Sequence, residues 1–219
     1  MRRFQFFLFV CIAVVVLYAC RDASQPFYSE IKAFKKADAQ QLPPKDAILF
    51  IGSSSIRMWD SLPSYFPGYT IVQRGFGGSG LNDAIRYADD IIFPYHPKQL
   101  VIYSGENDIA AGAKSTEVLQ RFMELFKLIR SQLPSAGVVY ISIKPSPSRA
   151  QYMPVMEEAN AMIRQFLSGY SETAYVDVYH RMLDSGGKPR AELFLDDQLH
   201  MNRMGYEIWK EDIAPLLEK

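Results

Sequence analysis

Five short apolar runs, each followed by a polar loop or a segment of helical periodicity, constrain the fold of this chain more than any other feature. The runs are rich in the β-branched and aromatic residues that favour strands, and they cover residues 47–51, 69–73, 99–103, 138–143 and 174–178. Segments with helical periodicity lie at about 81–93, 116–133, 152–168 and 203–218. This alternation is typical of βαβ units. It predicts a three-layer α/β/α sandwich around a five-stranded, mostly parallel sheet.

The first 20 residues have the pattern of an export signal. Arg2 and Arg3 precede an almost unbroken apolar run over residues 4–17, which closes on the sequence LYAC at 17–20. A basic start before an apolar run is typical of a secretory signal, and this run is near the short end for a membrane span. The ending resembles a bacterial lipobox, which implies cleavage before Cys20 and acylation of its thiol. We therefore expect an exported lipoprotein held at a membrane by this anchor, in the periplasm or at the cell surface.

The predicted organisation has three parts. Residues 1–19 form the lipoprotein signal peptide, residues 20–45 a tether with a short amphipathic helix at 27–39, and residues 46–219 one globular domain. The two cysteines, Cys11 and Cys20, both precede the domain, so its core is expected to hold without disulfides. Lys and Arg number 24, as do Asp and Glu, which gives no electrostatic reason to expect a nucleic-acid partner.

Four loops that follow predicted strands carry unusual sequences. They read GSSS at 52–55, RGFGGSG at 74–80, SGEND at 104–108 and DDQLHMN at 196–202. Each alone is typical of a helix cap or a tight turn, and the second also matches the G-x-G-x-x-G pattern of dinucleotide sites. That pattern normally follows the first strand and here follows the second, so no dinucleotide is expected. Because ligands bind beyond the carboxyl ends of parallel strands, the four loops together indicate one site there.

In this order the four loops resemble the motifs of the SGNH hydrolase family, also called GDSL-type esterases and lipases, over about residues 46–216. The resemblance implies a flavodoxin-like SGNH hydrolase fold. The family's Gly-Asp-Ser block is spelled Gly-Ser-Ser at 52–54, so Ser53 replaces the Asp and Ser54 keeps the nucleophile position. The remaining motif positions fall on Gly78, Asn107, Asp197 and His200.

Elementary chemistry gives these residues roles. A serine hydroxyl needs an imidazole to accept its proton as it attacks a carbonyl carbon. His200 is the candidate base for Ser54, and Asp197 is the candidate for orienting the imidazole ring. The positional alternatives are Ser53, Ser55 and Asp196, whereas His96 and His180 lie outside the motifs and are expected to be structural.

The same reaction needs donors for the oxyanion of its tetrahedral intermediate. The candidates are the backbone N–H groups of Ser54 and Gly78 and the side-chain amide of Asn107. Arg149 and Trp59 are candidate substrate-binding residues, because cationic and aromatic groups suit a glycan. The sequence contains no His or Cys cluster of metal-binding spacing, so neither a metal nor another cofactor is expected.

The sequence therefore predicts a serine esterase that hydrolyses carboxylic esters through an acyl-serine intermediate. A small-molecule or glycan ester is the preferred substrate, with deacetylation of carbohydrate favoured, because no long apolar insertion resembles a lipase lid. The same residues also suit a lysophospholipase, a short-chain lipase or a glycan O-acyltransferase. A catalytically inactive, glycan-binding lipoprotein is a further alternative, although every catalytic motif residue is present.

Overall fold

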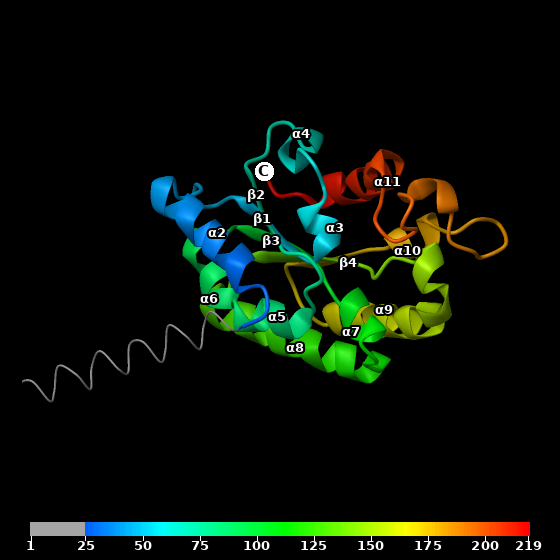
Figure 1. The fold of residues 1–219 in the computed structure, drawn as a ribbon. Coiled ribbons are helices and arrows are strands. Elements are labelled where there is room, and N and C mark those ends of the chain that lie inside the picture. Colours follow the sequence, from blue (N-terminus) through cyan, green and yellow to red (C-terminus); the bar gives the residue numbers. More distant parts are fainter. Residues whose placement is uncertain (1–24) are drawn as a thin grey trace, which may run out of the picture.

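The structure, a computed structural model, describes residues 25–219 and contains a five-stranded parallel sheet (Figure 1). The strand order is β2-β1-β3-β4-β5, and Ile48 of β1 aligns with Ile71 of β2 and Gln99 of β3. The predicted three-layer fold and its five strands are confirmed. The strands are β1 (Ile48–Gly52), β2 (Ile71–Gly75), β3 (Gln99–Tyr103), β4 (Gly137–Ile141) and β5 (Thr173–Val176).

Helices cover both faces of the sheet (Figure 1). One layer holds α5 (Leu81–Arg86), α6 (Ala88–Ile91), α8 (Ser115–Gln132) and α9 (Met153–Leu167). The opposite layer holds α3 (Ser54–Arg57), α4 (Leu62–Tyr65) and α11 (Arg203–Ile213). The short helices α7 (Glu106–Ala110) and α10 (Val178–Arg181) follow β3 and β5.

The strand sequences explain why the sheet is buried on both faces. Side chains alternate along a strand, so Leu49 and Ile51 enter one hydrophobic core while Ile48 and Phe50 enter the other. A parallel sheet between two helical layers therefore needs nearly continuous apolar strands. The five residues of β1 are all buried, as this requirement predicts.

Two predicted helices are shorter in the structure. The helix expected at 81–93 breaks into α5 and α6 at Tyr87, whose hydroxyl donates to the carbonyl oxygen of Pro26 (2.6 Å). The helix expected at 203–218 ends at Ile213 and continues as a 3₁₀ turn over Ala214–Leu216, which contains Pro215. Proline lacks the N–H that an α-helix interior uses.

The helix predicted at 27–39 is confirmed as α2 (Tyr28–Gln40), and it packs against the sheet-containing domain (Figure 1). Ile31 of α2 is buried in the main core. Asp38 accepts hydrogen bonds from Arg74 and Tyr95 (both 2.5 Å). The folded body therefore includes α2 as well as the domain expected from residue 46 onward.

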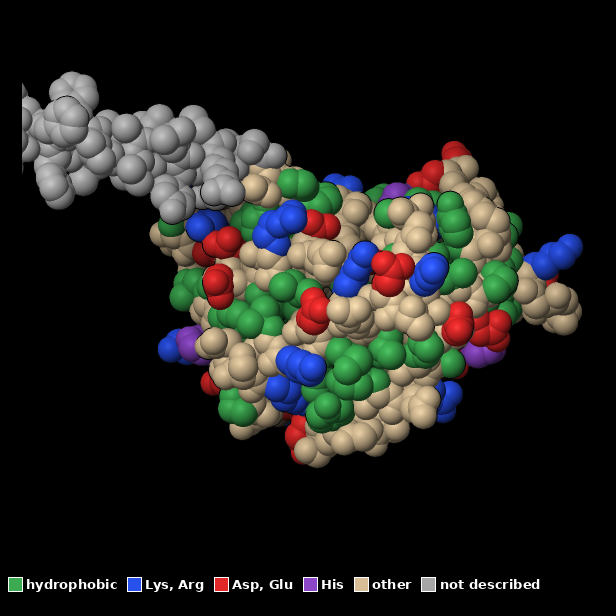
Figure 2. Space-filling view, turned by 90° about the horizontal axis from the view of Figure 1, so that it is seen from below, with side chains coloured by type: hydrophobic (Ala, Val, Ile, Leu, Met, Phe, Trp, Pro, Cys, Tyr) green, Lys and Arg blue, Asp and Glu red, His purple; other side chains and the backbone are tan. Residues whose placement is uncertain are grey.

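The predicted signal peptide and Cys20 lie outside the described residues. Within residues 25–219, every helix is too short or too polar to cross a lipid bilayer. Figure 2 looks onto the layer that contains α5, α8 and α9, where Lys or Arg and Asp or Glu side chains are interspersed with apolar ones. Neither sign of charge forms a continuous patch on this face.

Candidate active site

Gly52 ends β1 and sets the direction of the chain into α3. Its φ is +147°, and a Cβ at this position would lie 2.0 Å from the carbonyl oxygen of Tyr103 in the neighbouring strand. Only glycine fits there without a shift of the backbone. The close approach brings the following serines to the carboxyl edge of the sheet, at the start of α3.

Ser54 is the serine of this cluster that meets the predicted histidine. Its Oγ lies 2.9 Å from Nε2 of His200. Ser53 and Ser55 are 3% and 2% exposed and lie in the protein interior. Of the three serines, the structure therefore favours Ser54, which is also the one that aligns with the serine of the Gly-Asp-Ser motif.

Asp197 and His200 face one another because the loop between them is tightly turned. Gln198 adopts a left-handed φ of 54°, and Asp197 Oδ1 accepts the backbone N–H groups of Leu199 and His200 (both 2.9 Å). Asp197 Oδ2 lies 2.5 Å from Nδ1 of His200. Burial acts to raise the pKa of Asp197, but the His200 ring and these N–H groups outweigh it and lower the pKa to about 2. Asp197 is thus ionised at neutral pH and fixes the ring by accepting from Nδ1.

The residues considered as alternatives to Asp197 and His200 lie away from Ser54 or make no bond to the His200 ring. Asp196 is exposed and makes no hydrogen bond to His200. His96 ends a 3₁₀ turn before β3. His180 is exposed on α10, where its Nδ1 lies 2.9 Å from Asp177. Neither of these histidines lines the cavity at Ser54.

The three residues that carry the predicted oxyanion donors, Ser54, Gly78 and Asn107, line the same cavity. Gly78 has a φ of +78°, which glycine adopts readily, and forms the tight turn after β2. Asn107 donates one amide N–H to the carbonyl oxygen of Ser79 (3.0 Å) and accepts from Arg149 at its Oδ1 (3.0 Å). These bonds fix the amide plane, and its second N–H remains to serve a ligand.

A buried charged cluster behind the site was not predicted from the sequence. Lys144 is fully buried and donates to Glu106 (3.1 Å) and to the carbonyl oxygen of Leu199 (2.9 Å). Glu106 also accepts from Tyr103 and pairs with Arg149 (3.2 Å). Burial lowers the pKa of Lys144, while Glu106 acts to raise it. The cluster ties the loop before His200 to α7, which carries Asn107. Its one signal in the sequence was a lysine directly after the predicted strand at 138–143.

Of the two candidate substrate-binding residues, one lines the cavity and the other does not. Arg149 lines the cavity, where it contacts Asn107 and Glu106. Trp59 is fully buried in the core between α3 and α11, stacked on Tyr206 at 5.0 Å and packed against Trp209. The expectation for Trp59 was wrong, because a large ring after a short helix is drawn into the apolar core rather than toward solvent.

The cavity at Ser54 has a volume of about 590 Å³ and polar walls. Ser29 and Glu30 reach it from α2 and Arg57 from α3, none of which was predicted from the sequence. Leu199 is its one aliphatic lining side chain among the described residues. The complete lining is Ser29, Glu30, Ser54, Arg57, Gly77, Gly78, Asn107, Arg149, Leu199 and His200.

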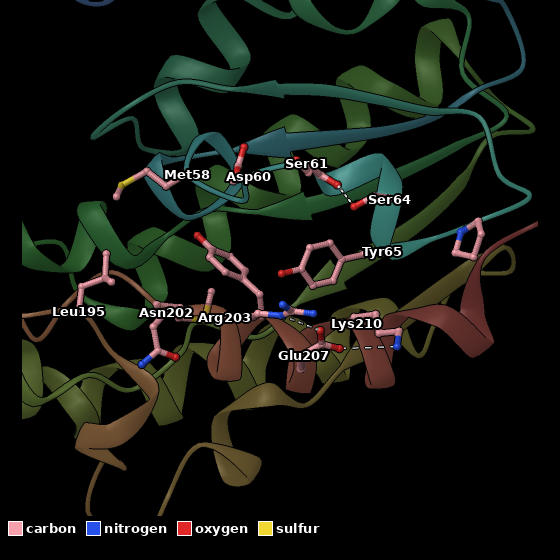
Figure 3. A pocket seen from close by; sticks show the side chains of 13 residues that line it. Met58, Asp60, Ser61, Ser64, Tyr65, Leu195, Asn202, Arg203, Glu207 and Lys210 are labelled. Atoms are coloured by element: carbon pink, nitrogen blue, oxygen red, sulfur yellow. Dashed lines mark hydrogen bonds and ion pairs between the residues drawn. The ribbon is translucent and has the colours of Figure 1, made fainter.

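A larger cavity of about 730 Å³ lies between the α3–α4 segment and α11 (Figure 3). Figure 3 shows Ser61 and Ser64 on one side and Glu207 on the other, with ion pairs of 3.6 Å from Glu207 to Arg203 and Lys210. It shares no lining residue with the cavity at Ser54 and contains none of the predicted catalytic residues. The predicted catalytic residues Ser54 and His200 therefore line the smaller of these two cavities.

A parallel sheet with a serine, an imidazole and a carboxylate hydrogen-bonded in series beyond its carboxyl edge has the arrangement of serine hydrolases. The sequence matches the GDSL-like lipase/acylhydrolase family over residues 51–208. The chain belongs to this family, which confirms the resemblance inferred from its motifs. A search of curated proteins finds no match.

Solved structures share the fold. A protein from Streptococcus pneumonia that carries the name platelet activating factor superposes on this chain with a TM-score of 0.76 at 20% sequence identity. The superposition covers 94% of this chain and 99% of that chain. A GDSL-like lipase from Bacteroides thetaiotaomicron gives 0.71 at 18% identity, with coverages of 84% and 95%. A catalytic mutant of Axe2, an acetylxylan esterase from Geobacillus stearothermophilus, gives 0.65 at 13% identity, with coverages of 80% and 94%. At these sequence identities the three comparisons show a shared fold.

Proposed function

We propose that the protein is a serine esterase in which Ser54 is the nucleophile, His200 the general base and Asp197 the residue that orients the base. The observation that carries this proposal is the continuous hydrogen-bonded series of 2.9 Å from Ser54 to His200 and 2.5 Å from His200 to Asp197. These separations suit proton transfer between nucleophile and base.

In the proposed reaction, the Ser54 proton passes to Nε2 of His200 as Oγ bonds to the ester carbonyl carbon. The carbonyl electron pair moves to the oxygen, which gives a tetrahedral intermediate. This pair returns when the C–O bond to the alcohol breaks, and the departing alcohol takes the proton from His200. Water then attacks acyl-Ser54, gives a proton to His200 and releases the acid. The proton finally returns to Oγ of Ser54. Asp197 stabilises the imidazolium in both halves of the cycle.

Oxyanion stabilisation is assigned to the N–H groups of Ser54 and Gly78 and to the Asn107 amide. Asn107→Ala is expected to lower kcat by about 10²–10³ while KM changes little, because this donor acts on charge that develops in the transition state. Steady-state hydrolysis of p-nitrophenyl acetate measures the effect. An unchanged kcat in a folded Asn107→Ala protein would remove Asn107 from the mechanism.

For the substrate we propose a short acyl ester of a polar molecule, with acetylated carbohydrate as the first class to test. The cavity supports this, because Glu30, Arg57 and Arg149 offer charged groups for hydroxyl-rich partners, and Leu199 is the one aliphatic side chain that residues 25–219 contribute to its lining. One structural neighbour is named as an acetylxylan esterase, which suggests acetylated xylo-oligosaccharides as a specific candidate.

A substrate comparison tests this part of the proposal. Acetate release from acetylated xylo-oligosaccharides is measured beside fatty-acid release from lysophosphatidylcholine, together with p-nitrophenyl acetate and p-nitrophenyl octanoate. We expect a higher kcat/KM for the acetyl esters. Preference for the octanoate and the lysolipid would instead support a lysophospholipase or short-chain lipase.

We also propose that the protein is exported and anchored through acylated Cys20, a position outside the described residues. Support comes from the basic start, the apolar run and the LYAC ending of the first 20 residues. Intact mass of the membrane-extracted protein tests this, since a chain that retains residues 1–19 and carries no acyl group would contradict it.

A further inference from the structure

The N-terminal helix α2 lies outside the family match, which begins at residue 51, yet it borders the active-site cavity. Besides its Asp38 contacts, α2 is held by an ion pair between Lys35 and Asp90 (2.7 Å). Phe27, just before the helix, packs edge-on against Phe76 with ring centroids 5.4 Å apart. The helix is therefore fixed at both ends beside the turn that follows β2.

Glu30 of α2 contacts this turn directly. Its Oε1 accepts the backbone N–H of Gly77 at 3.0 Å, one residue before the proposed oxyanion donor Gly78. On the sheet side of the turn, the Ser79 hydroxyl donates to the carbonyl oxygens of Phe76 (2.9 Å) and Gly52 (3.3 Å). Glu30 thus holds the turn from the side of α2, while Asn107 donates to the carbonyl oxygen of Ser79 just after it.

The glycine turn needs such support. Two successive glycines have no side chains with which to anchor themselves, and their backbone has more conformational freedom than that of any other residue type. An oxyanion donor is effective only when its N–H already points to the position of the developing charge. A shift of about 1 Å in a positioned group can cost roughly 10²-fold in rate.

The hydrogen bond, rather than the charge of Glu30, makes this contact effective. Arg57 approaches Glu30 at 3.8 Å, with side chains 50% and 34% exposed, and an exposed ion pair at this distance contributes little. The bond to Gly77 is shorter and reaches the backbone of the turn itself. A neutral acceptor of the same shape should therefore replace the carboxylate.

We propose that α2 contributes to catalysis through Glu30, which acts as a positioning residue. Glu30 holds the Gly77–Gly78 turn so that the Gly78 N–H faces the oxyanion. This inference rests on the proposed esterase function. It extends that function to a segment that precedes the family's motifs. Glu30 itself does not contact the reacting atoms in this assignment.

The test compares Glu30→Ala with Glu30→Gln in the full-length chain, kept in detergent. Glu30→Ala should lower kcat for p-nitrophenyl acetate about tenfold with KM nearly unchanged, because only transition-state stabilisation is lost. Glu30→Gln keeps the acceptor and should restore kcat to within about twofold. Lys36→Ala, at an exposed position on the same helix, is the matched control and should behave as wild type.

Amide hydrogen exchange at Gly77 and Gly78 gives a second readout that does not depend on activity. Exchange should be faster in Glu30→Ala than in wild type and near wild type in Glu30→Gln. Wild-type kcat in Glu30→Ala, or equal losses in both Glu30 variants, would overturn the proposal. If wild type hydrolyses no ester, the esterase function fails, and unchanged exchange in Glu30→Ala would then separately refute the positioning role.

Discussion

Ser54→Ala is expected to abolish ester hydrolysis, with kcat lower by about 10⁶, the order of magnitude lost when the nucleophile of such a triad is removed. The reason is that Ser54 Oγ is the group 2.9 Å from Nε2 of His200. His200→Ala should cost a similar factor, because nucleophile and base act as a unit and their losses do not add. A fluorophosphonate probe should label wild type at Ser54 and leave Ser54→Ala unlabelled.

Ser53→Ala is the matched control for this prediction. Ser53 is the adjacent serine, is buried, and makes no side-chain hydrogen bond to the start of α3. Its replacement should leave both labelling and kcat close to wild type. Label found on Ser53 or Ser55, or hydrolysis retained by Ser54→Ala, would disprove the assignment of the nucleophile.

Glu106→Leu should lower the free energy of unfolding by about 3–5 kcal/mol, the cost of removing one partner from a buried ion pair. Lys144 is fully buried and would lose its carboxylate partner, and Tyr103 would lose the acceptor of its hydroxyl. The loop before His200 would also loosen, because Lys144 donates to the Leu199 carbonyl oxygen. Urea unfolding followed by tryptophan fluorescence measures the change.

A second substitution shows whether Glu106→Leu destabilises the protein through the unpaired Lys144 charge or through altered packing. In Glu106→Leu with Lys144→Met, apolar side chains replace the fully buried pair, and Arg149, whose side chain is 18% exposed, loses one carboxylate partner. Much of the stability should return, since apolar replacement of a whole buried pair is often neutral. Glu124→Gln, on the exposed surface of α8, is the control and should unfold like wild type. A double variant no more stable than Glu106→Leu alone would argue that the unpaired Lys144 charge is not the cause.

Much of the fold and the triad followed from local sequence signals. The five strands were predictable because a parallel strand between helical layers is apolar on both faces, as β1 is. Ser54 was predictable because it lies just after a strand, at the edge where the carboxyl ends of parallel strands meet. Asp197 and His200 were predictable from their Asp-x-x-His spacing in a loop further along the chain. The same reasoning placed Gly78 and Asn107 at the cavity.

Other features depended on contacts between segments far apart in the chain. Trp59 was assigned to the substrate because a sequence does not reveal which face of a short helix meets Tyr206 and Trp209. The pairing of Glu106 with Lys144 joins loops after two different strands, and the contact of Glu30 with Gly77 joins the N-terminal helix to the turn after β2.

The sequence by itself determined the parallel α/β fold and the residues able to carry acyl transfer, because hydrophobic periodicity and loop motifs are local. The tertiary structure alone decided how the Asn107 amide is oriented and that α2 forms a wall of the cavity at Ser54. These choices depend on how the helices and loops pack around the sheet, and packing joins residues that no local pattern connects.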